Sequence, residues 1–327
     1  MDGEQFSFFM QISDAYTFRN TIQIIKSETD QATMILSPDT IEMSFVNNSK
    51  CAVHKIVLDI NEFHIYKYDI RNEDGTPMNE FPITFRTNEM FGPIKNISRK
   101  DGIMIFLLKG DNKLSIRPIK SSTKNTGKSK TLFVKIKNAG HVRFASKTDY
   151  SKEANVKVAS KDFVDVCTDA NTMKCNYLEI VGQKNGVIFR GILPNNEVIF
   201  NTPFENQNVL FGGSIRNISE LDKILNNLQF NQSSSSSSGS NSGGAATSNN
   251  NSSGLKQNLN IVKSEDLMTI KVPISTVKAL SKIHNISVQN TWLKFFFVEG
   301  GATKLESPIG TYGTYCIYLR NINTNNN

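Results

Sequence analysis

The chain has 327 residues, of which 38% are hydrophobic and 20% are charged, and its formal net charge is +7. This composition excludes a wholly disordered or fibrous protein, and the length is that of about two domains. The modest positive charge is compatible with a polyanionic partner but does not require one.

The first half of the sequence predicts two copies of one pattern, a short amphipathic helix followed by two strands joined by a tight turn. The first helix is expected from about Asp14 to Lys26, with Ser13 or Asp14 as N-cap, and its strands at 32–36 and 41–46. The second helix is expected from about Asn88 to Ser98, and its strands at 103–108 and 114–119. The residues expected to face the core from these helices are Ala15, Phe18, Ile22, Ile25, Phe91, Ile94 and Ile97.

The second half predicts the same pattern twice more. A third helix is expected with Ser160 as cap and strands at 178–181 and 187–193 around an Asn-Gly turn. A fourth helix is expected with Ser275 as cap, followed by a strand at 292–298 and a final run to Leu319. The residues expected to face the core are Phe163, Val166, Cys167, Ala170, Met173, Val277, Leu280 and Ile283.

The repeat favours two similar domains. We expect an N-terminal domain at 1–137, a connecting loop at 138–152, a C-terminal domain at 153–322 and a tail at 323–327. Because a helix in each unit must cover a sheet face, the predicted class is α+β with largely antiparallel sheets. The alternative is that helix-plus-hairpin units are common and that the fourfold count is chance.

Two stretches have a composition that does not favour a core. The segment 231–254 is rich in Ser, Asn and Gly, so we expect a flexible insertion in the C-terminal domain, after one short helix at 219–225. The Lys-, Ser- and Thr-rich segment 121–130 is expected to be an exposed loop.

No signature of catalysis is present. The four histidines (His54, His64, His141 and His284) are scattered and do not form an HExxH pair. The run at 125–129 resembles the end of a phosphate-binding loop, but Ser122 stands where that motif requires glycine. We therefore expect a binding or scaffold protein rather than an enzyme, with no cofactor and no metal site.

The cysteines and the N-terminal region indicate a reducing compartment. No two of the four cysteines form a CxxC pair, and Cys167 lies on the apolar face of a predicted helix, so free thiols are expected. No apolar run approaches the ~18 residues of a membrane span. The acidic start lacks the pattern of a secretory signal.

Basic residues gather on three of the four predicted helices. The first helix carries Arg19 and Lys26, the second ends in a basic group, and the third is dominated by aspartates. If the four helices line one surface, that surface can contact phosphates without reading bases. The alternative is a set of ordinary solvated helix faces. The remaining basic residues are Lys95, Arg99 and Lys100 near the second helix and Lys278 and Lys282 on the fourth.

Five segments together resemble sliding clamps of the proliferating-cell-nuclear-antigen (PCNA) type. No single segment is diagnostic, but their order and spacing match that family over nearly the whole chain, except roughly 203–262. The Asn- and Lys-rich style and the insertion suggest a large DNA virus or an AT-rich eukaryote as source. The matching segments are 32–43, 46–53, 161–169, 184–189 and 313–319.

The resemblance implies a ring, most often of three two-domain chains, with helices around a hole that duplex DNA threads and with paired edge strands between subunits. A trimer would carry 3 × (+7) = +21. Arg19, Lys26 and Lys282 fall on basic positions of the family's inner surface. Lys278, Lys95, Arg99 and Lys100 lie near such positions. Other inner positions depart from the family, so DNA contacts are expected to be skewed toward the N-terminal half; these positions are Pro93, Thr168, Thr172 and Ser275.

The resemblance also implies a hydrophobic pocket under the connecting loop that takes a partner helix with an aromatic anchor. Phe144 would supply the apolar wall of the loop, and Lys184 aligns with a lysine that eukaryotic members use for ubiquitin attachment. Prolines that the family usually carries at two positions of this region are absent. The expected pocket residues are Val46, Lys50, Cys51, Val53, Phe144, Ala302 and Tyr318.

The expected function is that of a DNA polymerase processivity factor, which tethers polymerase and other replication and repair proteins to DNA, with or without a clamp loader. Its expected location is the nucleus or a cytoplasmic viral factory. Two alternatives remain open: a monomeric or dimeric clamp-like viral factor, and a transcription or interaction scaffold that has the clamp fold without encircling DNA.

Overall fold

The computed structural model describes residues 6–121, 130–138, 146, 148–151, 153–184, 186–205, 266–288, 291–299 and 302–320. All of them belong to one of the two units into which the chain divides, formed by Met1–Asn206 and Glu265–Asn327. The expected insertion at 231–254, the expected helix at 219–225 and most of the loop expected at 121–130 lie outside the described residues. The predicted domain boundaries remain a prediction.

The described strands form three sheets in which every pair is antiparallel. The first has five strands, in the order β5 (Ile65–Tyr68), β1 (Phe6–Ile12), β7 (Gly102–Leu108), β8 (Lys113–Ile119) and β9 (Leu132–Lys135). The last has four strands, in the order β14 (Val198–Glu205), β13 (Gly186–Ile192), β12 (Tyr177–Gln183) and β15 (Asp266–Pro273).

The sheet between them has nine strands and contains both the early and the late part of the chain. Its halves meet where β4 pairs with β18, with Ile56 opposite Tyr315. The order of its strands is β10 (Lys137–Asn138), β6 (Phe81–Arg86), β2 (Gln31–Leu36), β3 (Thr40–Val46), β4 (Ala52–Asp59), β18 (Gly313–Leu319), β17 (Thr303–Ile309), β16 (Trp292–Phe296) and β11 (Val156–Ala159).

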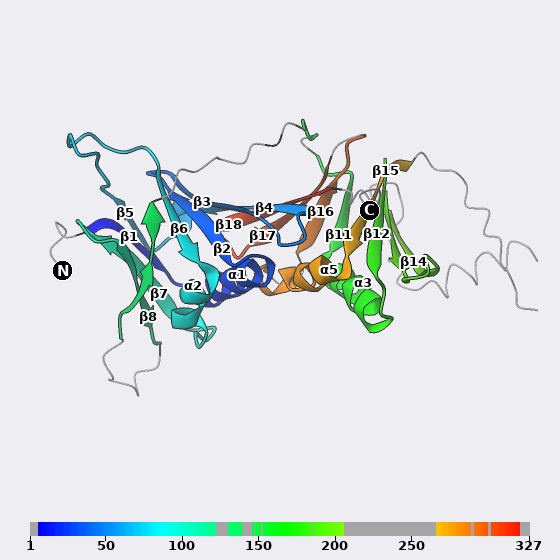
Figure 1. Cartoon of the computed structure of the whole chain (residues 1–327), viewed down its shortest axis with the longest axis horizontal. Coiled ribbons are helices and arrows are strands. Elements are labelled where there is room, and N and C mark those ends of the chain that lie inside the picture. The colour runs from blue at the N-terminus through cyan, green and yellow to red at the C-terminus, as the bar shows by residue number, and fades with distance from the viewer. Residues whose placement is uncertain are drawn as a thin grey trace, which may run out of the picture. The chain divides into compact units, whose positions relative to one another are not determined.

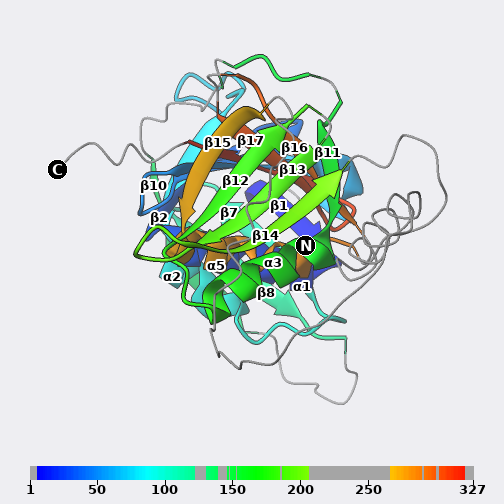
Figure 2. The ribbon, with the colours of Figure 1, turned by 90° about the vertical axis from the view of Figure 1, so that its right-hand side faces the viewer.

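The helices of this unit lie along one side of the sheets (Figure 1). In the turned view, α3 and α5 run beneath the four-stranded sheet (Figure 2). The described helices are α1 (Ala15–Glu28), α2 (Thr87–Ile94), α3 (Ser160–Thr172) and α5 (Ile274–Leu280), with short 3₁₀ turns η1 (Ile60–Glu62) and η2 (Ile283–Asn285). None in the described part combines the length and the hydropathy that a bilayer span requires.

Helix α1 follows the sequence pattern closely. Asp14 is its N-cap, and the Asp14 Oδ1 atom accepts a hydrogen bond from the backbone N–H of Thr17 at 3.1 Å. Phe18, Ile22 and Ile25 are fully buried against the sheets. The predicted helix and the predicted α+β class with antiparallel sheets are therefore confirmed.

Helix α2 is shorter than expected. It ends at Ile94 instead of Ser98, with Pro93 in its last turn and Lys95 as the C-cap. Met90 is fully buried, and Phe91 is partly buried and packs against the core, so the expected inward position of Phe91 is confirmed.

The two predicted serine caps are wrong. Helices α3 and α5 begin at Ser160 and Ile274, after Ala159 and Pro273, and neither start has a side-chain cap. Strand β11 runs directly into α3, so the Ser160 hydroxyl instead donates to the Thr291 carbonyl at 2.9 Å.

One further expectation fails near the end of an element. Met173 lies beyond the last turn of α3 and is 42% exposed, so the buried side of that helix ends at Ala170. The expected final run is two strands, β17 and β18, because the chain turns at Gly310, whose φ of 49° favours glycine.

Candidate nucleic-acid interface and partner surface

Helices α1 and α2 are joined by Arg19. Its Nε atom donates to the Lys95 carbonyl, the C-cap of α2, at 2.9 Å, and its Nη1 atom donates to Asn20 Oδ1 at 3.0 Å. Asn20 is buried, and its Nδ2 atom donates to the Asn285 carbonyl at 2.9 Å. These bonds fix Arg19 at a point where α1, α2 and η2 meet.

Aromatic rings hold the basic side chains of the N-terminal half. The guanidinium carbons of Arg19 and Arg99 each lie 5.5 Å from the centre of the Tyr16 ring, and Lys26 Nζ lies 4.7 Å from that of Phe91. The pKa of Tyr16 is lowered, first by a hydrogen bond with Asn20 and further by Arg99, against an opposing effect of burial. The ring therefore sits in a positive field.

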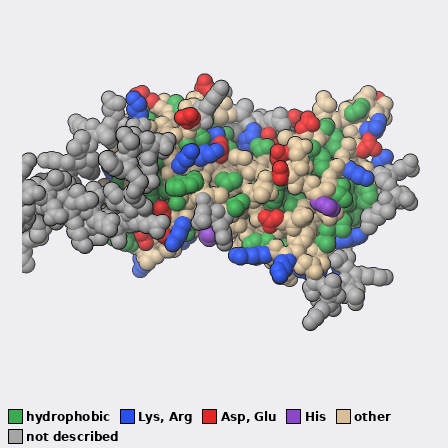
Figure 3. All heavy atoms as spheres, turned by 180° about the vertical axis from the view of Figure 1, so that it is seen from behind, with side chains coloured by type: hydrophobic (Ala, Val, Ile, Leu, Met, Phe, Trp, Pro, Cys, Tyr) green, Lys and Arg blue, Asp and Glu red, His purple; other side chains and the backbone are tan. Residues whose placement is uncertain are grey.

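The predicted DNA-binding residues have no carboxylate partner within the described part of the chain. Lysines elsewhere do; Lys120 Nζ, for example, lies 2.8 Å from Asp101 Oδ2. Cation–π contacts do not neutralise a charge as ion pairs do, so the positive charge stays available to an anion. Space-filling atoms show Lys and Arg side chains along the lower edge of Figure 3, the edge that carries the helices.

The C-terminal half contributes less positive charge. Lys278 is exposed on α5, whereas Lys282 lies past the end of that helix, in the turn before η2, and is partly buried. The exposed face of α3 carries Asp162, Asp165 and Asp169. The structure thus brings together Arg19, Lys26, Lys95 and Arg99 around α1 and α2. Lys282 is the N-cap of η2, whose Asn285 carbonyl accepts from the Asn20 side chain beside Arg19, and Lys278 lies on α5.

Three of the expected pocket residues, Val46, Val53 and Tyr318, lie in one row on the face of the nine-stranded sheet away from the helices. Strand register puts Val46 beside Val53, Val53 beside Tyr318, and Tyr318 beside Lys304. Phe296 continues the row next to Lys304. Val46 is 52% exposed.

Tyr150 covers one end of this row. Its hydroxyl donates to the Ala302 carbonyl at 2.8 Å, and its ring lies 5.9 Å from that of Tyr318 and 6.4 Å from that of Phe296. Lys304 Nζ lies 4.5 Å from the centre of the Phe296 ring. The result is an aromatic surface with a basic edge.

Two of the expected pocket residues lie elsewhere, and one cannot be placed. Cys51 is buried with its thiol toward Ser49 and Thr276, so it does not line the surface. Lys50 is exposed in the turn between β3 and β4, with a φ of 55°. Phe144 lies outside the described residues. Lys184 is exposed in the turn after β12.

Two sheet edges expose apolar side chains. On β9, Leu132 is 41% and Phe133 is 61% exposed; on β14, Val198 is 51% and Ile199 is 44% exposed. Beside β9 a shallow cavity of about 420 Å³ opens toward α2. Such edges favour pairing with another chain. The residues that line the cavity are Glu89, Gly92, Pro93, Leu132, Phe133 and Lys135.

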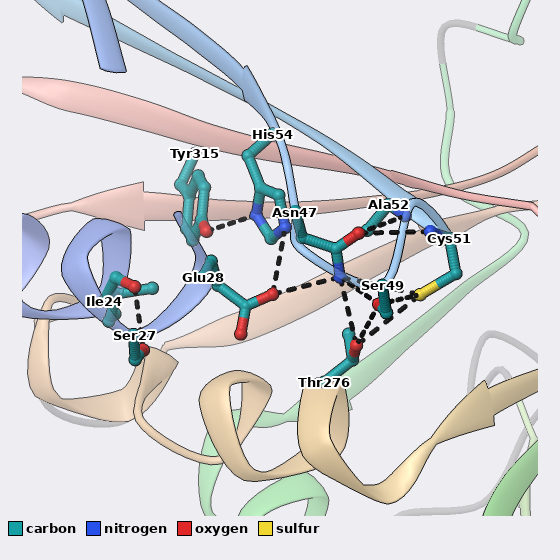
Figure 4. Close-up of polar contacts among 10 residues, drawn as sticks. All are labelled: Ile24, Ser27, Glu28, Asn47, Ser49, Cys51, Ala52, His54, Thr276 and Tyr315. Atoms are coloured by element: carbon teal, nitrogen blue, oxygen red, sulfur yellow. Dashed lines mark hydrogen bonds and ion pairs between the residues drawn. The ribbon is translucent and has the colours of Figure 1, made fainter. Parts of the chain in front are cut away.

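A buried polar network crosses the junction of β4 and β18 (Figure 4). Asn47 Nδ2 lies 3.1 Å from Glu28 Oε2 and 3.0 Å from Thr276 Oγ1, so it links α1 with α5. His54, which is fully buried, contacts the Tyr315 hydroxyl through Nδ1 at 2.6 Å and lies 3.6 Å from Glu28 Oε2 through Nε2. Burial, and next the nearby Glu28, raise the pKa of Tyr315.

Sequence reasoning missed Tyr16, Tyr150 and Lys304 at these surfaces. An aromatic residue three positions before Arg19 was a usable signal for Tyr16, because residues three apart share a helix face. Nothing in the sequence places Tyr150 against Tyr318, because that contact depends on the fold. The described residues contain no cluster of side chains suited to a metal, and the four buried cysteines are free thiols.

Comparisons with known proteins bear on the fold. No family model matches the sequence, and no curated protein matches it. Among solved structures, Proliferating Cellular Nuclear Antigen from Entamoeba histolytica aligns with a TM-score of 0.61 and 11% identity over 96% of this chain and 98% of that chain. A PCNA2–PCNA3 complex from Sulfolobus tokodaii aligns with a TM-score of 0.61 and 10% identity over 95% and 98%. At these identities the likeness concerns the fold alone, and the chain has the α+β fold of a PCNA-type sliding clamp.

Proposed function

We propose that this protein is a sliding clamp, a processivity factor that encircles duplex DNA and tethers a DNA polymerase and other replication or repair proteins to it. It is a binding protein and not an enzyme. The observation that carries the proposal is a group of basic side chains on the helical side of a clamp fold, without carboxylate partners in the described residues. Three of them, Arg19, Lys26 and Arg99, contact aromatic rings.

Enclosure makes weak contacts sufficient. A ring that surrounds DNA is retained by topology, so its phosphate contacts need neither sequence specificity nor high affinity. Three chains would bring +21 to the assembly. The acidic face of α3 means that this charge acts mainly through α1 and α2.

Ring closure follows from the edge strands. If β9 of one copy pairs antiparallel with β14 of the next in the register that places Lys135 opposite Glu197, the exposed apolar side chains of both strands become buried. Lys135 and Glu197 are both exposed in the single chain. This heterologous contact repeats head to tail and closes when the rotation permits.

A topological assay tests the function. Protein bound to a nicked DNA circle should survive a high-salt wash and be released when a restriction enzyme linearises the circle, whereas simple phosphate binding is lost in the wash. Release that does not depend on linearisation would refute encirclement. Such a result would favour the non-encircling scaffold, with which the acidic α3 face is also compatible.

A charge exchange tests the subunit contact. By light scattering, the wild type should have about three times the chain mass of 36.6 kDa. Lys135→Glu alone should lower that mass, and Lys135→Glu together with Glu197→Lys should restore it. A double variant no better assembled than the single one would contradict the β9–β14 pairing.

The outer aromatic row is the proposed docking surface for the polymerase and other partners. A helical segment with an aromatic anchor would bury that ring between Val46, Tyr318 and Tyr150. The protein would then act where DNA is replicated, in a nucleus or a cytoplasmic viral factory. A clamp loader would open the ring so that DNA can enter it. Modification of Lys184, exposed at the end of a hairpin, would leave this surface free.

A further inference from the structure

We propose that Tyr16 is a positioning residue that holds Arg19 and Arg99 together as a two-guanidinium clamp for the phosphodiester backbone of duplex DNA. The inference rests on the proposed function and adds to it a fixed phosphate site. The remaining lysines of the helical side then serve as diffuse charge.

Tyr16 contacts both arginines. Both guanidinium carbons lie 5.5 Å from the centre of its ring, within the range of a cation–π contact. Two like charges would otherwise repel each other and spread into solvent. The negative face of the ring offsets part of this repulsion, so the pair is held together before an anion arrives.

Arg19 is anchored by hydrogen bonds but still has N–H donors left for an anion. Two of its N–H groups are occupied, by the Lys95 carbonyl and by Asn20 Oδ1. A guanidinium has about five N–H donors in a planar fork, so roughly three remain for an anion. Bidentate recognition of phosphate needs just such a planar and immobilised group.

The segment that carries Arg99 is anchored as well. Asp101 accepts the backbone N–H of Ser98 at 2.9 Å through Oδ2, and its carbonyl accepts the backbone N–H of Ala15 at 3.3 Å. Lys120 Nζ lies 2.8 Å from the same carboxylate and neutralises it. Arg99 is therefore held at the first turn of α1, beside Tyr16.

The neighbouring Lys100 provides a matched comparison. It follows Arg99 directly, is also exposed and carries the same charge, but within the described residues it contacts no aromatic ring. If DNA affinity depends on overall charge alone, Arg99 and Lys100 contribute equally to it. If the two-guanidinium clamp binds phosphate, Arg99 contributes more to DNA affinity than Lys100 does.

The test is fluorescence anisotropy of the full-length protein with a short labelled duplex, over about 50 to 200 mM salt. Arg99→Gln should weaken binding about fivefold to tenfold and lower the slope of log affinity against log salt by ~0.9 per contact, and Lys100→Gln should weaken it less than about threefold. Tyr16→Leu changes no charge at neutral pH but should weaken binding about fivefold, because it removes two cation–π contacts. Tyr16→Phe keeps the ring and loses only the hydrogen bonds of the hydroxyl with Asn20 and Arg99, so its affinity should lie between those of the wild type and Tyr16→Leu.

Equal losses in Arg99→Gln and Lys100→Gln, or wild-type affinity in Tyr16→Leu, would overturn the clamp. If circular dichroism shows that Tyr16→Leu misfolds, the comparison of the two surface variants decides alone. Polyglutamate that competes with the duplex equally well would overturn the assignment to phosphate. In each of these cases the wild type can still be released from DNA circles by linearisation. The two-guanidinium clamp can therefore be refuted while the proposed sliding-clamp function stands.

Discussion

Replacing Asn47 with Ala should test the buried network at the junction of β4 and β18. Asn47 is 3% exposed, and its Oδ1 atom accepts the backbone N–H groups of Cys51 at 3.1 Å and Ala52 at 3.0 Å. Its Nδ2 atom reaches Glu28, Ser49 and Thr276. An amide nitrogen has only about two protons to donate, so these last contacts share them.

The expected cost follows from the groups left without a partner. Asn47→Ala strands two buried N–H groups and removes a donor from the Glu28 carboxylate, which is 5% exposed. At about 1–3 kcal/mol for each stranded group, with some relief from relaxation, the free energy of unfolding should fall by about 4 kcal/mol.

Urea unfolding followed by circular dichroism measures this change, provided the slope with denaturant is unchanged. Asn48→Ala is the matched control, because Asn48 is the exposed neighbour and should cost less than about 0.5 kcal/mol. Adding Glu28→Gln to Asn47→Ala should cost less than the sum of the single changes. A loss below about 1 kcal/mol in Asn47→Ala, or strict additivity, would refute the reasoning.

Three further outcomes are expected. Burial raises the pKa of Asp101, but hydrogen bonds from Lys120 and from the backbone N–H of Ser98 outweigh this effect and hold the pKa at about 2. The ionised carboxylate therefore contributes about 2 kcal/mol to the free energy of unfolding above pH ~4, and this contribution is lost as the pH falls toward 2. In urea titrations at several pH values, Asp101→Asn should show a smaller loss of stability between pH ~4 and 2 than the wild type. Gly182→Ala places a Cβ 2.4 Å from the Phe297 ring and should destabilise the protein by about 1–3 kcal/mol in thermal unfolding. Burial raises the pKa of Cys167 and Cys175, and that of Cys316 to about 11, so a thiol reagent at pH 8 should label the native protein slowly and the urea-unfolded protein at once; rapid native labelling would contradict the buried placement of these thiols.

The sequence predicted helices and hairpins well where local chemistry decides them. Asp14 capped α1 as expected, and the Asn-Gly signal marked the turn between β12 and β13. The prediction failed at Ser160 and Ser275, because a strand runs directly into each helix and no loop residue precedes the helix to cap it with its side chain. It also failed at the end of α2, because the isoleucine spacing continues to Ile97 although the helix ends at Ile94.

The surfaces were only partly predictable, for a different reason. A basic residue on a helix can be read from its position. Its lack of a carboxylate partner among the described residues, and the place of Tyr16 beside both arginines, depend on the tertiary structure. In the same way Val46, Val53 and Tyr318 are far apart in the sequence, and only strand register places them in one row. Cys51 was misplaced because the residue after a turn can face either side of a sheet.

The position of β18 has a consequence for biosynthesis. This strand is inserted between β4 and β17, yet it is made long after β4. During most of translation, therefore, the edge of β4 that later pairs with β18 has unpaired backbone N–H and C=O groups. We expect chaperones that shield unpaired strands to bind the newborn polypeptide during this interval, until β18 emerges and seals the gap.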